Sequence, residues 1–182
     1  WIASGSTGGF PDAVAKPGRA MMVDAVCQRN FYHGDFGRTF VLGEPSKEIL
    51  ERMRILKIGR DTAFGAIKPG MNILDVGANL GFYTTLFGKK TGPTGKVIAL
   101  EPDPENFRFL CKNVEHNQLH NIETVQVAAA RQQGEMQLFT SSGNRGDNRL
   151  YANDLADGSV QVKVVRLDDL LPQLGVRELN LI

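Results

Sequence analysis

The stretch ILDVGANLGFYTT, residues 73–85, decides how this chain is expected to fold. A run of apolar residues ends at Asp75, and an apolar, helix-like run resumes at Phe82. The side chains between the two runs are small: Gly77, Ala78, Asn79 and Gly81. Such a loop leaves its backbone bare, so a ligand can lie against it, and the following helix offers its N–H groups to an anion. The alternative is that the glycines only make a tight turn and let the helix pack close to the strand.

The same order of strand, loop and helix is repeated along the chain. NILDV (72–76), KVIALE (96–101) and IETVQVAAA (122–130) are typical of buried strands. EMQLFT (135–140) and VQVKVVRL (160–167) alternate like partly exposed strands, for which antiparallel pairing is one option. The alternation predicts an α/β fold with a mostly parallel sheet, right-handed crossovers and helices on both faces. Ligands of such sheets bind at the carboxyl ends of the strands.

Two helices are expected between these strands. The first is expected to end near Gly88, with lysines following, and to bury three bulky residues, Phe82, Leu86 and Phe87. The second starts at Asp103, a good N-cap, with Pro104 in the first helical position. Its apolar stripe is expected to contain Phe107, Leu110, Cys111 and Val114.

The N-terminal part differs in composition. Residues 1–20 are rich in Gly, Ser and Pro, and a short strand at 38–42 and a helix from about Pro45 are expected after them. We therefore expect a leader or cap at 1–37 and a ligand-binding domain at 38–182. The last residues, ELNLI, are typical of the opening of a buried strand, which suggests that the sequence is part of a longer domain.

Composition narrows the function classes. The 182 residues carry a net charge of +1 and no long block of Lys and Arg, which argues against a nucleic-acid partner. The two cysteines, Cys27 and Cys111, give neither a disulfide framework nor zinc-ligand spacing, so no metal site is expected. A reducing, cytoplasmic setting is the default, and no stretch is apolar enough to span a bilayer.

The loop sequence also selects among ligands. The glycine positions of a dinucleotide fingerprint are occupied by Asn79 and Phe82, which disfavours a nicotinamide-dependent dehydrogenase, and the P-loop pattern fails as well. Glu101 ends the second strand, where a carboxylate can accept hydrogen bonds from both hydroxyls of a ribose. Asp75 lies where it can meet an ammonium group, directly or through water. An ammonium, a carboxylate, a ribose and an adenine together describe S-adenosyl-L-methionine.

Several motifs in combination resemble one enzyme family. DVGANLGFYT, VIALEPDPENFRFLCKNVEHNQL and VQVAAA look like a class I S-adenosylmethionine-dependent methyltransferase. More narrowly, the chain resembles the FkbM-type group in four motifs: Asp75 to Gly81, Glu101–Pro102, Asn113 with Asn117, and Leu167 to Leu170. The resemblance implies a Rossmann-like sheet of seven strands, whose C-terminal strands are missing from this chain.

The resemblance also implies roles for individual residues. The methionine part of the cofactor is expected against the loop formed by Asp75, Gly77, Ala78, Asn79 and Gly81. Glu101 matches the ribose-binding acid, and Pro102 and Ala128 match residues that contact the adenine. Many relatives carry an Asp where this chain reads AAARQQG, so a backbone group is expected to contact the adenine amine here.

The resemblance favours O-methylation of a hydroxyl on a small molecule or a glycan. The alternatives are a nucleic-acid or protein methyltransferase, which lacks support because the Asn/Asp-Pro-Pro-Tyr motif and the Pro-Cys pair are absent, and a non-catalytic cofactor-binding module. No catalytic residue is assigned, because the family's Lys-x-Asp-x-Glu-Gly is expected just after Ile182. The acceptor and the oligomeric state stay open.

Overall fold

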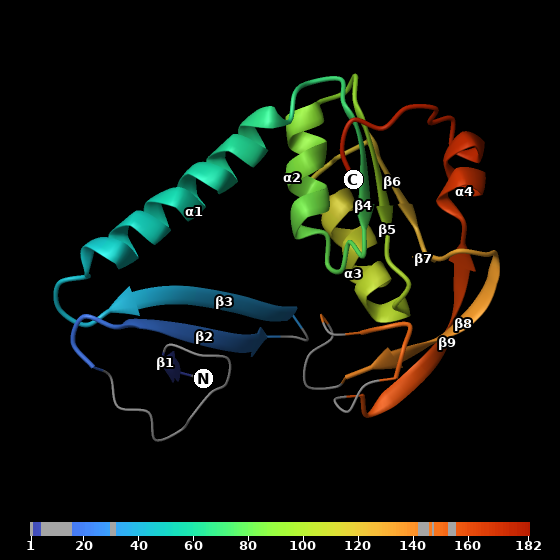
Figure 1. The fold of residues 1–182 in the computed structure, drawn as a ribbon. Coiled ribbons are helices and arrows are strands. Elements are labelled where there is room, and N and C mark those ends of the chain that lie inside the picture. The colour runs from blue at the N-terminus through green and yellow to red at the C-terminus, as the bar shows by residue number, and fades with distance from the viewer. Residues whose placement is uncertain (1, 5–15, 30–31, 142–145, 147, 153–155) are drawn as a thin grey trace. The chain divides into compact units, whose positions relative to one another are not determined.

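The computed structural model describes residues 2–4, 16–29, 32–141, 146, 148–152 and 156–182, of which 2–4, 22–29 and 32–38 are described by their backbone. The chain forms two compact units, Trp1–Phe64 and Gly65–Ile182 (Figure 1). This division falls between Phe64 and Gly65. The expected division into a leader at 1–37 and a ligand-binding domain at 38–182 stays a prediction.

The first unit contains a β-sheet and a long helix. Strands β1 (Ile2–Ser4), β2 (Ala20–Arg29) and β3 (Tyr32–Val41) pair antiparallel in that order. Helix α1 (Lys47–Ala66) begins one residue after Ser46, whose Oγ accepts a hydrogen bond from the N–H of Ile49 at 3.3 Å. The expected helix is therefore present, although no residue of α1 is buried and Leu56 is 73% exposed.

The second unit is built on a parallel sheet. Strands β4 (Asn72–Val76), β5 (Lys96–Leu100) and β6 (Ile122–Val125) lie in the order β4-β5-β6, all parallel. Helix α2 (Phe82–Thr91) connects β4 to β5, and helix α3 (Pro104–His116) connects β5 to β6. On the other side of β4, Leu181 forms a parallel bridge with Ile73, which agrees with the strand expected to open there. The strand order thus reverses at β4.

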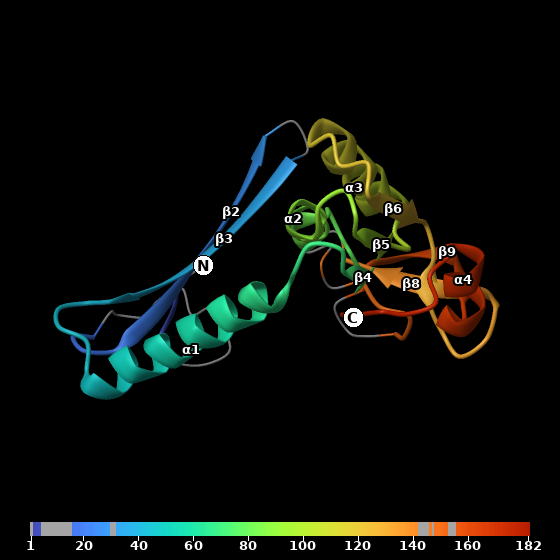
Figure 2. The same cartoon turned by 90° about the horizontal axis from the view of Figure 1, so that it is seen from above.

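Helices cover both faces of this sheet (Figure 2). On one face Ala78, Ala99 and Leu110 form a buried cluster against which side chains of α3 pack. On the other face Leu74, Ile98 and Leu100 pack with leucines of α4 (Leu167–Gln173). Successive residues of β5 point to opposite faces, and its residues 97–100 are all apolar and buried, so this strand is covered on both sides. The expected α/β class is confirmed.

The expected third strand is divided in two. Strand β6 ends at Val125, and β7 (Ala128–Ala129) pairs in parallel with β9 (Gly158–Val165) in a separate sheet. The single strand predicted at 122–130 was therefore wrong, because two short strands that serve different sheets share one apolar stretch. The antiparallel pairing considered for the next two segments is confirmed, since β8 (Gly134–Thr140) pairs antiparallel with β9.

The first helix of the second unit departs from its prediction. Helix α2 continues past Gly88 to Thr91, and Gly92 at φ 64° is its C-cap. Its buried residues are Thr84, Gly88 and Thr91, whereas Phe82 is 74% exposed. A Cβ at Gly88 would lie 2.6 Å from Ile122 Cδ1, so small residues let α2 approach the sheet closely. None of the helices in the described part of the chain is both long and apolar enough to cross a membrane.

Candidate functional site

The loop between β4 and α2 has the backbone conformation that its glycines predict. Gly77, Asn79 and Gly81 have φ values of 78°, 52° and 88°, in the left-handed region where glycine is favoured and asparagine is tolerated. The N–H groups of Gly77 and Ala78 both donate to the carbonyl of Leu100, each at 2.9 Å. These two hydrogen bonds hold the loop against the carboxyl end of β5.

The two glycines of this loop have different surroundings. A Cβ at Gly81 would lie 2.6 Å from Leu110 Cδ1, a side chain that is fully buried. A Cβ at Gly77 would meet nothing within 4 Å. Gly81 therefore serves close helix packing, the structural alternative considered for the sequence, whereas Gly77 presents bare backbone to open space.

Glu101 joins this loop to the end of β5. Its Oε2 accepts a hydrogen bond from the N–H of Asn79 at 2.7 Å, and its Oε1 accepts one from the N–H of Asp103 at 3.0 Å. Burial raises the pKa of the Glu101 carboxyl above its ordinary value, and the hydrogen bonds from Asp103 and Asn79 partly oppose that shift. The side chain of Asn106 also forms a hydrogen bond with this carboxylate. A carboxylate has about four acceptor positions, so about one is left for a ribose hydroxyl.

Asp75 is the second acid of the site. It is half-buried near the end of β4, and its Oδ2 accepts a hydrogen bond from the hydroxyl of Thr84 at 2.6 Å. Burial raises the pKa of the Asp75 carboxyl, and the hydrogen bond from Thr84 partly lowers it. Asp75, near the end of β4, and Glu101, just after β5, thus lie at the carboxyl ends of neighbouring parallel strands.

The start of α2 is the third feature of this edge of the sheet. Gly81 is its N-cap and has no side chain to accept from the first helical N–H groups. Those groups have no acceptor within the helix, and they carry the positive end of its dipole. The start of α2 therefore suits a carboxylate, and it lies beside β4 where the strand order reverses, the usual ligand position in open parallel sheets.

The start of α3 forms the neighbouring part of the rim. Pro102 is half-buried, and Asp103 caps α3 by accepting from two backbone N–H groups at 2.9 Å each. Asp103 Oδ2 also accepts from Asn148 Nδ2 at 3.0 Å, which holds Asn148 against this cap. The predicted N-cap is confirmed, and the link to Asn148 was not predicted.

Ala128 is placed apart from the other predicted site residues. It is buried at the start of β7, where it pairs with Val164 of the second sheet. The preceding residue, Val127, packs in the same cluster as Leu100. The structure therefore joins the glycine loop to Glu101 through the Asn79 hydrogen bond and Asp75 to helix α2 through Thr84, while Ala128 is connected to Leu100 through the core.

Two further side chains hold the site, and sequence reasoning gave them no role there. Asn113, known only as part of a motif, donates from Nδ2 to the carbonyl of Leu80 at 2.7 Å. Thr84 contacts Asp75 across two elements. The sequence held one signal for Thr84: it lies three residues after Gly81, so the two residues share the face of α2 that packs closely.

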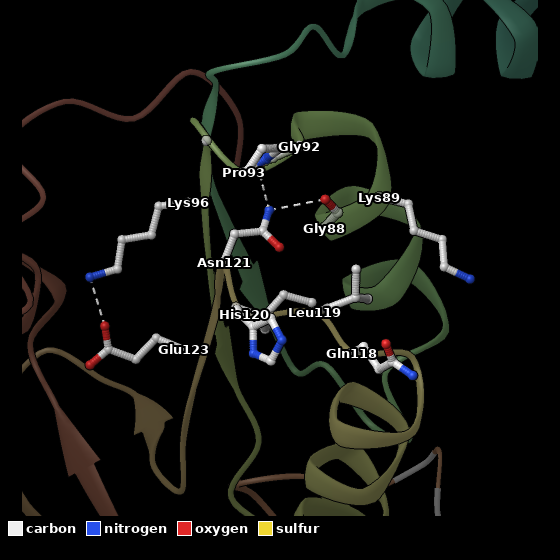
Figure 3. A pocket seen from close by; sticks show the side chains of 12 residues that line it. Gly88, Lys89, Gly92, Pro93, Lys96, Gln118, Leu119, His120, Asn121 and Glu123 are labelled. Carbon is white, nitrogen blue, oxygen red and sulfur yellow. Dashed lines mark hydrogen bonds and ion pairs between the residues drawn. The ribbon is translucent and has the colours of Figure 1, made fainter.

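A hollow lies at the opposite end of the sheet, where β5 and β6 begin (Figure 3). Its polar groups are paired with one another: Asn121 donates to the carbonyls of Gly88 and Gly92, and Lys96 forms an ion pair with Glu123 at 2.7 Å. These contacts join the ends of secondary structure elements. Among the residues that the structure describes, no group of three or more His, Cys, Asp and Glu side chains is placed to hold a metal ion.

Comparisons with protein families give two matches along the chain. Residues 75–182 match the family model described as "Methyltransferase FkbM domain", which is more than half of the chain. Residues 2–83 match the model described as "Metallopeptidase family M24", which is less than half of the chain. The two matches overlap at residues 75–83.

The curated relatives are methyltransferases. The chain is 37% identical over 68 residues to an arsenite methyltransferase of Halobacterium salinarum, a match that spans 37% of this chain and 17% of that protein. It is 26% identical over 129 residues to "Methyltransferase 1" of Beauveria bassiana, which spans 60% of this chain and 51% of that protein. The chain thus spans about half of these relatives' length or less.

Solved structures give weak overall similarity. The methyltransferase FkbM of Methylobacillus flagellatus aligns at 16% identity with a TM-score of 0.38, over 56% of this chain and 23% of that one. A "SAM dependent methyltransferase" of Aquifex aeolicus aligns at 34% identity with a TM-score of 0.33, over 41% of this chain and 36% of that one.

Proposed function

The chain belongs to the methyltransferase FkbM domain family, and we propose that its second unit is the cofactor-binding part of an S-adenosyl-L-methionine-dependent methyltransferase. The family match begins at Asp75, the first residue of the glycine loop, and continues through the rest of the chain. The loop, the acid after β5 and the reversal of strand order at β4 all support a nucleoside ligand at this edge of the sheet.

The described residues fit the parts of this cofactor. Gly77 leaves open space beside bare backbone, and the uncapped start of α2 suits the methionine carboxylate. Asp75 provides a negative charge for the ammonium group, and Glu101 provides an acceptor for a ribose hydroxyl. We assign Pro102 and Ala128 to the adenine end, and Ala78, Asn79 and Gly81 to the loop around the methionine part.

The observation that carries the proposal is the hydrogen bond from the N–H of Asn79 to Glu101 Oε2 at 2.7 Å. It joins the residue expected to bind the ribose to the loop expected to bind the methionine part. Both halves of the ligand are thereby recognised by one preorganised unit, which lowers the cost of ordering the site on binding.

When bound, S-adenosyl-L-methionine supplies a methyl group that is activated by a positively charged sulfur. The main work of this chain's residues is then alignment, and holding two reactants in near-attack geometry supplies about 7–11 kcal/mol. Asp75 and the start of α2 would hold one end of the cofactor, and Glu101 would hold the sugar. These residues fix the donor and leave the acceptor to other parts of the site.

We propose a hydroxyl of a small molecule or a glycan as the methyl acceptor. The near-balanced net charge of +1 gives no electrostatic attraction for a polyanion, which disfavours the alternative of a nucleic-acid acceptor. The lack of a disulfide framework supports a reducing, cytoplasmic setting. Transfer of labelled methyl groups to a panel of glycans, small hydroxylated molecules, RNA and proteins distinguishes these acceptors.

Cofactor binding is tested by calorimetric titration of the wild-type chain with S-adenosylhomocysteine, the demethylated product. We expect saturable binding with a dissociation constant of about 1 μM, which corresponds to about −8 kcal/mol. The Glu101→Gln variant is expected to bind at least about tenfold more weakly, because one charged acceptor of the ribose becomes a donor.

Glu123→Gln is the matched control for Glu101→Gln. Glu123 lies on the neighbouring strand β6 at the other end of the sheet, and it is paired with Lys96. Its replacement is expected to leave the affinity unchanged. Equal affinities of wild type and the Glu101→Gln variant would refute the assignment of the ribose, and NADH binding in place of S-adenosylhomocysteine would favour a dehydrogenase.

A further inference from the structure

The three threonines of helix α2 use their hydroxyl groups differently. Thr85 donates to the carbonyl of Phe82 at 3.0 Å, and Thr91 donates to the carbonyl of Phe87 at 2.9 Å. Both hydroxyls donate within the helix, the usual choice for a helical threonine, and that of Thr91 also accepts from Asn121 Nδ2 at 3.1 Å. Thr84 instead donates to Asp75 Oδ2 on strand β4 at 2.6 Å, although Thr84 and Thr91 are both fully buried.

The bond from Thr84 occupies one oxygen of the Asp75 carboxylate. No partner from the described residues is found for the other oxygen, Oδ1, and no buried side-chain oxygen among them lacks a partner. Oδ1 is therefore accessible to solvent. The Thr84 hydroxyl thus fixes the Asp75 carboxylate in one orientation. Oδ2 points towards the helix, and Oδ1 can accept a hydrogen bond from a ligand.

We propose that Thr84 is a positioning residue that aims the Asp75 carboxylate at the primary ammonium group of the cofactor's amino-acid end. The inference rests on the proposed function and deepens it, because it assigns selectivity for the amino-acid end to one pair of side chains. Thr84 contributes to the binding of ligands that carry this ammonium group, and not to the binding of the bare nucleoside.

The same hydrogen bond affects the charge of Asp75. Burial raises the pKa of the Asp75 carboxyl and the Thr84 hydroxyl lowers it, so removal of the hydroxyl raises the pKa further. Asp75 must be ionised to pair with an ammonium group. Glu101, the residue after β5, is the other acid of this edge, and its buried carboxyl also has a raised pKa. We assign it to the ribose, which both kinds of ligand share.

The test compares three variants by calorimetric titration with S-adenosylhomocysteine and with adenosine. Thr84→Val removes the hydroxyl at nearly constant shape, Thr84→Ser keeps it, and Thr91→Val makes the same change at an equally buried position two turns further along α2. We expect Thr84→Val to weaken S-adenosylhomocysteine binding about tenfold and adenosine binding less than about twofold. Thr84→Ser and Thr91→Val are expected to bind both ligands like wild type.

The pH dependence gives a readout that a general packing defect would not change. The acid limb of S-adenosylhomocysteine binding is expected to move to higher pH in Thr84→Val and to stay in place in Thr91→Val. In an Asp75→Asn background, Thr84→Val is expected to cause no further loss of affinity. If Thr84→Val does not fold, as judged by circular dichroism, Thr84→Ala replaces it in the same cycle.

The outcomes separate this inference from the proposed function. A wild-type chain that binds neither ligand overturns the proposed function, and this inference with it. A wild-type chain that binds both, with Thr84→Val equal to Thr91→Val or equally weakened for both ligands, overturns the inference alone.

Discussion

Replacement of single glycines by alanine should separate stability from ligand binding in the loop after β4. Gly77 and Gly81 have similar φ values of 78° and 88°, so an alanine is strained at either position. They differ in space, because a Cβ at Gly81 would lie 2.6 Å from Leu110 Cδ1 and a Cβ at Gly77 would meet nothing within 4 Å. Gly175, at φ 74° and also with nothing within 4 Å, provides a control outside the loop.

The expected costs follow from these surroundings. A left-handed φ costs an L-residue about 1–2 kcal/mol, which is the whole expected loss of unfolding free energy for Gly77→Ala and Gly175→Ala. Gly81→Ala adds the overpacking of a fully buried leucine, about 1–3 kcal/mol, so its total is about 2–5 kcal/mol. Gly81→Ala should therefore be the least stable of the three variants.

Ligand binding should follow a different order. The methyl group of Gly77→Ala enters the open space that we assign to the cofactor, so this variant should bind S-adenosylhomocysteine at least about tenfold more weakly than wild type, a loss of about 1.4 kcal/mol. Gly175→Ala should bind like wild type. Urea unfolding measures the first order, and calorimetric titration measures the second.

The binding order and the stability order can each be contradicted by one result. If Gly77→Ala bound S-adenosylhomocysteine as tightly as Gly175→Ala, the open space beside Gly77 would not be the ligand site. If instead Gly81→Ala were as stable as Gly77→Ala, Leu110 would have room to move and the close packing inferred at Gly81 would be wrong.

Substitutions at three other positions test the hydrogen bonds of their side chains. Asp103→Ala should lower the unfolding free energy by about 1–2 kcal/mol, because it removes the cap of α3, whereas Asp103→Asn should keep most of it; urea midpoints measure both. Asn113→Ala should cost about 1 kcal/mol and weaken ligand binding, since the carbonyl of Leu80 loses its donor; an unchanged midpoint would contradict this. Because burial raises the folded-state pKa of Asp75, its protonated form favours the folded state, and this contribution is present at low pH and is lost as pH rises through that pKa. The unfolding free energy of wild type should therefore fall relative to that of Asp75→Asn as pH rises across this range. Urea unfolding of both proteins at a series of pH values measures this.

Much of the fold was predictable because local signals agreed with the packing. Asp103 and Pro104 begin α3 as expected, and the apolar β5 is buried on both faces. The loop was predictable for the same reason, since Gly77 and Gly81 adopt the left-handed conformation that glycine favours.

Helix α2 shows where local signals were insufficient. Its aromatic residues suggested a buried apolar face, yet Phe82 is 74% exposed and the small residues Thr84 and Gly88 are buried. The distance between the helix and the sheet decides which face is buried, and that distance is a property of the packed structure. Gly88 and Gly92 both resemble helix stops, and only the contact of Gly88 with Ile122 shows that Gly88 belongs inside the helix.

The positions of the two acids of the candidate site were predictable, and the side chains that form hydrogen bonds around them were less so. The positions of Asp75 and Glu101 at neighbouring strand ends followed from the strand pattern. The side chains of Thr84 and Asn113 reach the site from helices, and their hydrogen bonds depend on how those helices lie. The division between β6 and β7 could not be predicted either, because it depends on pairing with β9, more than 30 residues further along the chain.

The most direct test of the proposed site is a crystal structure of the chain grown with S-adenosylhomocysteine. A ribose hydroxyl should lie within hydrogen-bond distance of Glu101, with the amino-acid end between Asp75 and the start of α2. Two results would contradict the assignment: a nucleoside bound in the hollow beside Asn121, or open space beside Gly77 that stays empty at saturating ligand.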